Sequence, residues 1–100
     1  MNNVQLTKIL NKIDLKEIQH HWQNVQLGFF TEVFNYELTY KNYWLSINFN
    51  VNGVFSTDCF ELEDLSILDY CLYDEDNDLP LTHEQEIRLE NTLKQLINDF

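Results

Sequence analysis

The stretch Tyr43–Val54, YWLSINFNVNGV, combines a strict alternation of side chains with an Asn-Gly pair near its end. Apolar side chains occupy every second position of this stretch: Tyr43, Leu45, Ile47, Phe49 and Val51. Trp44, Ser46, Asn48 and Asn50 fall on the opposite face. A period of two is typical of a half-buried strand. We therefore expect a strand over 43–51 whose apolar face contacts the core.

Asn52-Gly53 predicts a two-residue hairpin turn, because both central positions of a type I′ turn need positive φ. A third strand would then return antiparallel from Val54. The expected cross-strand pairs are Val51 with Val54, Phe49 with Ser56, Ile47 with Asp58, Leu45 with Phe60 and Tyr43 with Leu62. This register puts Asp58 on the apolar face, which requires either a bulge near Asp58 or an open end of the sheet.

Two further strands are expected on either side of this hairpin. Phe34, Tyr36, Leu38 and Tyr40 share a face and lead into Lys41-Asn42, a second tight turn. Downstream, the segment 66–73, SILDYCLY, also alternates and predicts a fourth strand. The strands would form an antiparallel meander over 29–73.

Helical periodicity marks both ends of the chain. Leu6, Ile9, Leu10 and Ile13 form one apolar stripe, with Lys8 and Lys12 on the wet side. A second helix would begin at Asp14, where Glu17 completes a capping box, and run to about residue 26. One bent helix would fit the N-terminal unit 1–26 equally well.

The C-terminal helix, over 82–100, has a local start signal in Thr82 and Gln85, a second capping box. Its expected buried stripe consists of Leu89, Leu93, Leu96, Ile97 and Phe100. The sequence thus predicts an α+β fold, one domain over 1–100, in the order ααββββα with the helices on one face of the sheet.

Composition narrows the class of protein. The chain has 100 residues, 44% of them hydrophobic, and 14% aromatic, which is typical of a folded globule. The polar opening does not resemble a signal peptide, and no apolar run is long enough to span a bilayer, so we expect a cytoplasmic protein. Cys59 and Cys71 are expected to be reduced and buried, although a single bridge between them would also fit.

The net charge of −11 is unevenly distributed along the chain. Residues 1–57 carry four acidic and four basic side chains, which cancel. Residues 58–100 carry thirteen acidic side chains against Arg88 and Lys94. The whole imbalance therefore lies in the C-terminal half, and this asymmetry is the main functional clue in the sequence.

The densest acidic run is DEDND, residues 74–78. Asp74, Asp76 and Asp78 have the 1, 3, 5 spacing of an EF-hand loop. The sixth position of such a loop needs glycine and here is Leu79, and the twelfth, normally glutamate, is Gln85. A calcium site of this kind is not expected, and the run is interpreted as an acidic connection into the last helix.

The histidines and cysteines have no partner at a spacing typical of catalysis or cofactor binding. His83 fits the first residue of a capped helix, and the cysteines form no CxxC motif. There is no phosphate loop, glycine-rich nucleotide fingerprint or nucleophile elbow. We therefore expect a protein without enzymatic activity, metal or cofactor.

Direct binding of nucleic acid is opposed by the charge, because affinity for phosphates comes from Lys and Arg. The converse is favoured, since a folded surface of carboxylates can occupy a basic groove. The candidate partner-binding residues are Asp58, Glu61, Glu63, Asp64, Asp69, Asp74, Glu75, Asp76, Asp78, Glu84 and Glu86, with Trp44 and Phe55 as aromatic anchors. The two aromatic side chains, on the polar sheet face, would be either exposed or covered by loops or a second copy of the chain.

In size, in charge and in an acidic loop that leads into a C-terminal helix, the chain resembles small acidic inhibitors encoded by phages and mobile elements, including anti-CRISPR proteins and DNA mimics. This resemblance implies an inhibitor in the host cytoplasm that occludes a basic nucleic-acid-binding surface of a CRISPR-Cas complex or nuclease, without contacting nucleic acid or membrane. An immunity protein that neutralises a nuclease toxin is the first alternative. A small acidic adaptor subunit that forms homodimers through a sheet edge is the second.

Overall fold

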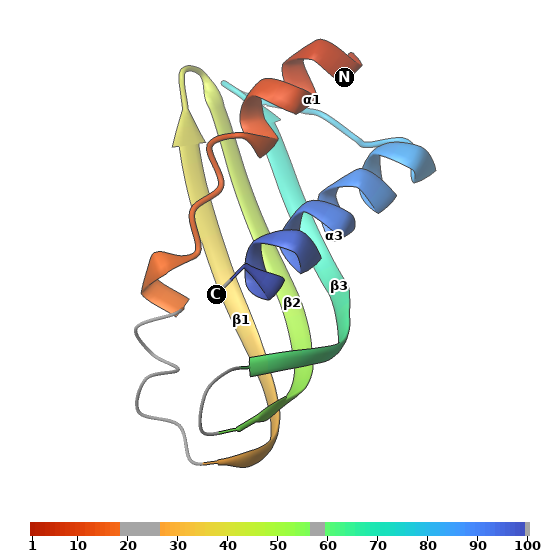
Figure 1. Ribbon diagram of the computed structural model, residues 1–100. Coiled ribbons are helices and arrows are strands. Elements are labelled where there is room, and N and C mark those ends of the chain that lie inside the picture. Colours follow the sequence, from red (N-terminus) through yellow and green to blue (C-terminus); the bar gives the residue numbers. More distant parts are fainter. Residues whose placement is uncertain (19–26, 57–59, 100) are drawn as a thin grey trace.

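The computed structural model describes residues 1–18, 27–56 and 60–99. Two helices and one sheet of four strands make up most of this part of the chain (Figure 1). The elements are α1 (Asn3–Leu10), β1 (Gly28–Tyr40), β2 (Tyr43–Phe55), β3 (Phe60–Asp74), β4 (Asn77–Asp78) and α3 (His83–Asn98), with a further helical turn at 16–18. The antiparallel order β1-β2-β3-β4 confirms the predicted α+β meander.

The predicted strand over 43–51 is confirmed, and it lies in the middle of the sheet. Leu45, Ile47, Phe49 and Val51 are buried almost completely. The turn at Lys41-Asn42 is also confirmed, because Tyr40 pairs with Tyr43 directly across it. Lys41 adopts φ 54°, the left-handed conformation that such a tight turn requires.

The hairpin predicted at Asn52-Gly53 is wrong. Strand β2 continues through this pair to Phe55, and β3 begins only at Phe60. Leu45 pairs with Leu72 and Ile47 with Tyr70, so the predicted partners Phe60 and Asp58 are replaced by residues much later in the chain. In place of a turn, the ladder between β2 and β3 has a register shift between Asn52 and Gly53.

Packing among aromatic rings explains why the strand continues. The ring of Phe30 makes edge contacts with Phe55 (centroids 5.3 Å apart) and Phe60 (6.2 Å), and these two rings lie 4.8 Å apart. A turn at Gly53 would dismantle this cluster. Clustered aromatic side chains contribute more than a local turn preference of two residues.

The predicted third and fourth strands are largely one strand. Segment 66–73 is the second half of β3 and pairs with β2. A second register shift, between Asn48 and Phe49, takes up one extra residue of β3 at Leu68. The fourth strand of the sheet is instead β4, which pairs with Tyr73 and Asp74 at the end of β3.

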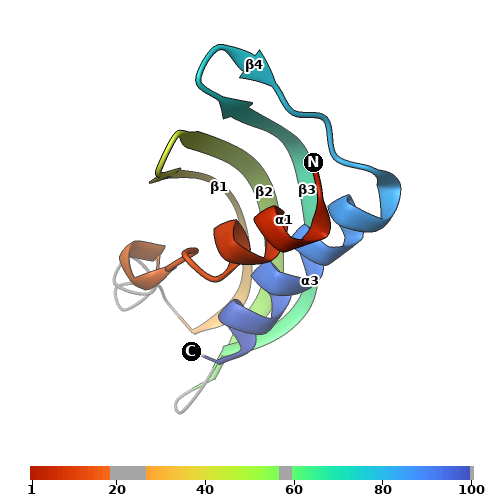
Figure 2. The same cartoon turned by 90° about the horizontal axis from the view of Figure 1, so that it is seen from above.

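Both α1 and α3 lie on the concave face of the curved sheet (Figure 2). Leu6, Ile9 and Leu10 of α1 are buried there, as the periodicity predicts. From α3, the described part of the expected stripe is buried at Leu89, Leu93 and Ile97, whereas Leu96 is half-buried. No helix within the described residues is long and apolar enough to cross a membrane.

The predicted capping box of the last helix is confirmed, and its glutamine has a second role. The backbone N–H of Gln85 donates to Thr82 Oγ1, and Gln85 Oε1 accepts from the N–H of Thr82 (3.0 Å). Gln85 is buried, and its Nε2 donates to the carbonyl oxygen of Met1 (2.8 Å) and to Asn3 Oδ1 (3.1 Å). This side chain therefore joins the start of α3 to the start of α1.

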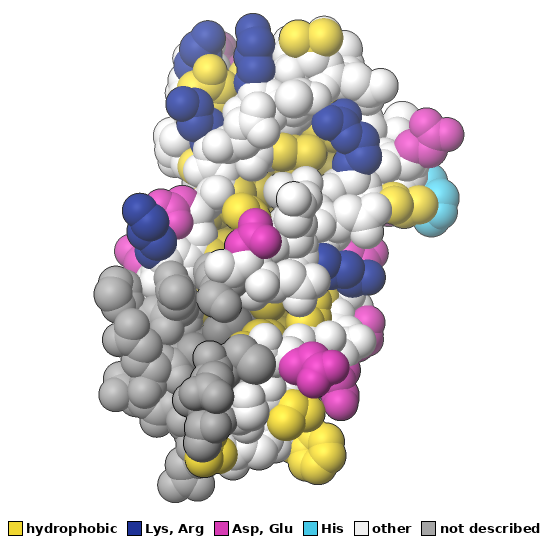
Figure 3. All heavy atoms as spheres, in the orientation of Figure 1, with side chains coloured by type: hydrophobic (Ala, Val, Ile, Leu, Met, Phe, Trp, Pro, Cys, Tyr) yellow, Lys and Arg dark blue, Asp and Glu magenta, His cyan; other side chains and the backbone are white. Residues whose placement is uncertain are grey.

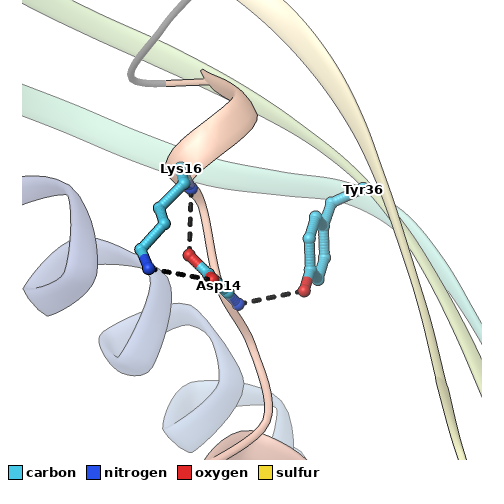
Figure 4. Close-up of polar contacts among 3 residues, drawn as sticks. All are labelled: Asp14, Lys16 and Tyr36. Atoms are coloured by element: carbon cyan, nitrogen blue, oxygen red, sulfur yellow. Dashed lines mark hydrogen bonds and ion pairs between the residues drawn. The ribbon is translucent and has the colours of Figure 1, made fainter.

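The predicted cap at Asp14 is present in a different form (Figure 4). Asp14 Oδ1 accepts from the backbone N–H of Lys16 (3.1 Å), which caps the helical turn at 16–18. In the predicted capping box, the backbone N–H of Asp14 would donate to the side chain of Glu17. It donates instead to the hydroxyl of Tyr36 on β1 (3.0 Å). The remainder of the predicted second helix, with His20 and His21, lies outside the described residues.

Candidate functional site

None of the six Lys and Arg residues belongs to β3 or β4. Lys12 and Lys41 both lie over the ring of Tyr40, with each Nζ 5.4 Å from the ring centroid. Arg88 Nη2 donates to Thr7 Oγ1 (2.7 Å), which turns this cation toward α1. In Figure 3, basic side chains gather at the top of the view and acidic ones occupy much of the right-hand margin.

Acidic side chains, in contrast, follow β3 and its turn into β4. We call this set the acidic edge: Glu61, Glu63, Asp64, Asp69, Asp74, Glu75, Asp76 and Asp78. Within the part of the chain that the structure describes, none of these carboxylates forms an ion pair. The charge asymmetry of the sequence thus becomes a spatial asymmetry, with unneutralised carboxylates along one side of the sheet.

The acidic edge is long and sparsely charged. Asp74 lies thirteen residues after Glu61 along the strand, or about 43 Å at ~3.3 Å per residue, and the molecule is 44 Å long. Its carboxylates are on average about 5 Å apart along the edge, against about 1.7 Å per phosphate in duplex DNA. The edge can therefore supply several separate contacts to a basic surface, at roughly a third of the charge density of a duplex.

The DEDND run is a tight hairpin that links β3 to β4. Asp74 ends β3, Glu75 has φ 54° at the turn, and Asp78 ends β4. The backbone N–H of Glu75 donates to the carbonyl oxygen of Asn42 (3.0 Å), so this turn contacts the β1–β2 turn. Among the described residues, no group of three or more His, Cys, Asp and Glu side chains is arranged to hold a metal ion.

The two candidate acids of α3 differ in their contacts. Glu84 is exposed in the first turn of the helix. Glu86 is half-buried and accepts from the hydroxyl of Tyr70 (3.0 Å), which itself accepts from the backbone N–H of Leu81 (3.2 Å). Burial, together with the bond to Glu86, raises the pKa of the Tyr70 hydroxyl above its usual range, against the opposing effect of the Leu81 bond.

Asp69 belongs to a chain of polar contacts across three strands on the convex face of the sheet. Its Oδ1 accepts from Asn48 Nδ2 (2.6 Å), and Asn48 Oδ1 accepts from Asn35 Nδ2 (2.8 Å). These bonds hold Asp69 in one position while leaving its second oxygen available. No described helix covers this face (Figure 2).

The two predicted aromatic anchors do not lie together. Trp44 is 37% exposed on the convex face and stacks on Tyr73, with centroids 5.5 Å apart and planes 11° apart. Phe55 lies instead on the concave side with Phe30 and Phe60, which corrects the prediction. Since β2 does not turn at Gly53, the period of two carries Phe55 to the same face as Val51.

Other predicted side chains can also be placed. Cys71, expected to be buried, is exposed on the convex face beside Tyr73. The negative charge of a Cys71 thiolate and a hydrogen bond with Cys71 raise the pKa of Tyr73. Asp58 and Cys59 lie outside the described residues.

A groove lies between β3 and α3, and sequence reasoning did not anticipate it. It has a volume of about 520 Å³ and is lined by residues 67–70 of β3 and by His83, Glu86, Ile87 and Glu90 of α3. The alternation in 66–73 does indicate that Tyr70 and Leu72 face the helices. The position of α3 against β3 depends on tertiary packing, and no local signal in the sequence specifies it.

Comparisons with protein-family models, with curated proteins and with solved structures found no match to this chain. The candidate site therefore has to be interpreted from its own geometry and charge.

Proposed function

We propose that this chain is a non-enzymatic inhibitor that places its acidic edge on a basic, nucleic-acid-binding surface of a partner in the cytoplasm, such as a CRISPR-Cas complex or another nuclease. The observation that carries the proposal is the separation of charge. Eight carboxylates on β3, its turn and β4 have no cation among them, because the chain has no Lys or Arg between Lys41 and Arg88.

Electrostatic steering explains how such a surface would work. Unpaired carboxylates on one side of a small protein attract a basic groove over distances of about a Debye length, ~10 Å at moderate salt. Trp44, stacked on Tyr73 and uncovered by any described helix, would supply apolar contact area beside the charges. The low density of charge along the acidic edge favours a partner with separate basic positions over one that needs a continuous polyanion.

The test compares two triple variants with the same change in net charge. Glu75, Asp76 and Asp78 are all exposed at the hairpin and are replaced by lysine in the first variant. Glu17, Glu37 and Asp99, also exposed but away from the acidic edge, are replaced by lysine in the control. Each purified protein is used to capture partners from a lysate of the organism that encodes it.

We expect the wild type and the control variant to capture a nucleic-acid-binding enzyme. The hairpin variant should not capture it. Added DNA or RNA should release it, and higher salt should weaken its capture steeply. The proposal is overturned if the partner is retained in saturating nucleic acid, or if the hairpin variant captures it equally well. A salt-insensitive dimer with no captured enzyme would instead support the adaptor alternative.

A further inference from the structure

The outer edge of β3 has unpaired backbone groups over most of its length. Within the described residues, β4 pairs only with Tyr73 and Asp74, which leaves residues 61–70 without a neighbouring strand on that side. The carbonyl oxygen of Leu72 still accepts from the N–H of Leu79 (2.8 Å). Because bonding direction alternates along a strand, the backbone N–H and C=O of Tyr70 point to the same, open side.

The groove between β3 and α3 lies directly beside this open edge. Its β3 wall is the segment 67–70, and its other wall is the first half of α3. An open strand edge next to a helix is the arrangement into which an extended peptide can add as a further strand. Its main chain would bond to the edge, and its alternate side chains would contact the helix.

Side chains of the groove specify the chemistry of such a peptide. Leu68 (57% exposed) and Ile87 (43% exposed) offer apolar contacts from the two walls. Glu86 and Glu90 of α3 add two carboxylates, and no Lys or Arg of the described residues lines the groove. Asp69 borders the groove through β3, while its carboxylate bonds to Asn48 on the convex face. Glu90 pairs with Lys94 (3.5 Å), whereas Glu86 accepts from the neutral hydroxyl of Tyr70 and has no cation beside it among the described residues.

A second copy of this chain is a poor occupant for the same reason. Pairing two β3 edges would bring together two strands that each carry Glu61, Glu63, Asp64 and Asp69 with no compensating cation. Like charges on paired strands repel, and charged side chains are a common protection of edge strands against self-association. The charge pattern opposes self-pairing of β3 and favours a basic segment.

We infer that the groove between β3 and α3 binds an extended protein segment that alternates basic and apolar residues, which joins the sheet as a strand beside β3. The site is separate from the inhibitor role proposed above, since it requires a strand-forming peptide and not a nucleic-acid-binding surface.

The probe is a short peptide of alternating lysine and valine, acetylated and amidated at its ends, with a glutamate-valine peptide of the same length as its counterpart. Binding to the full, isotope-labelled chain is followed by NMR. The lysine peptide should bind at least about tenfold more tightly, and the largest shifts should be at the amides of 65–70 and 83–90.

Two matched variants separate the groove from general charge attraction. Ile87→Lys adds one positive charge inside the groove, and Val4→Lys adds the same charge on α1 at a side chain that is 66% exposed. Ile87→Lys should weaken binding about tenfold or more, whereas Val4→Lys should change it less than about twofold. Far-UV circular dichroism checks that both variants fold.

Peptides N-methylated at alternate residues test strand addition directly. Methylation of the residues whose N–H groups face β3 should abolish binding, and methylation of the intervening residues should not. The inference is overturned by no binding, by shifts confined to the hairpin at 74–78, by equal effects of the two methylation patterns, or by a dimer formed through β3 in sedimentation experiments.

Discussion

The ring of Phe60 lies so close to Gly53 that a Cβ atom at Gly53 would overlap it and would also come within 2.6 Å of the carbonyl oxygen of Glu61. Of the two glycines, Gly28 has a positive φ (114°) and Gly53 does not, so Gly53 does not adopt a left-handed backbone conformation. The missing side chain at Gly53 therefore serves close packing between β2 and β3, and not a turn.

Gly53→Ala should for this reason lower the free energy of unfolding by about 1–3 kcal/mol, because both a ring and a backbone oxygen must move. Urea denaturation measures the loss. Asn52→Ala, at the neighbouring half-buried position, is the control and should cost less than about 1 kcal/mol. Equal stability of the two variants would contradict the packing role of Gly53.

Gln85→Glu should destabilise the protein by about 2 kcal/mol or more at neutral pH. The glutamate could keep the capping bond to Thr82, but it would lose the two N–H donors that face the carbonyl oxygen of Met1 and Asn3 Oδ1. A buried carboxylate opposite two acceptors is unfavourable while ionised. The loss should shrink as pH falls and the carboxylate becomes protonated, which denaturation at pH 7 and pH 4 would detect.

Gln85→Ala provides the comparison, since it removes both the cap and the donors without adding a charge. Its cost should be about 1–2 kcal/mol and should vary less with pH than that of Gln85→Glu. If the two variants show the same pH dependence, an ionised carboxylate at position 85 is not destabilised by the facing oxygens of Met1 and Asn3.

Tyr70→Phe should cost about 1 kcal/mol at neutral pH, because it removes the bonds to Glu86 and Leu81. The raised pKa of Tyr70 fixes the sign of the pH effect. Its contribution is fully present below the usual tyrosine pKa of ~10 and is lost as pH rises through the folded-state value. The difference in unfolding free energy between wild type and variant should therefore shrink above about pH 10. A difference that stays constant from pH 7 to pH 10.5 would contradict this interpretation.

Glu75→Asn should stabilise the protein by about 0.5–1 kcal/mol. Glu75 has φ 54°, a conformation that costs most side chains roughly 1 kcal/mol and that asparagine tolerates. Glu75→Gln removes the same charge without this conformational gain, so it is the matched control. In thermal denaturation, Glu75→Asn should be more stable than both Glu75→Gln and the wild type. Equal stabilities of the two variants would mean that any gain comes from the loss of charge and not from the backbone conformation.

Local sequence signals correctly predicted those parts of the fold that are stabilised by contacts between residues close together in the sequence. The cap formed by Thr82 and Gln85 and the turn at Lys41-Asn42 are both present as predicted. Asn52-Gly53 carries an equally strong local signal and is part of a strand, because the rings of Phe30, Phe55 and Phe60 pack together only if β2 continues. The same continuation moved Phe55 to the core side of the sheet.

The candidate site divides in the same way. The sequence by itself determined that the unpaired negative charge would lie in the C-terminal half, because charge is fixed by residue type and chain position. Only the tertiary structure decided that much of this charge follows a single edge strand and that α3 forms a groove beside it. The register of β3 and the position of α3 depend on burial among residues far apart in the chain, and no local pattern encodes such contacts.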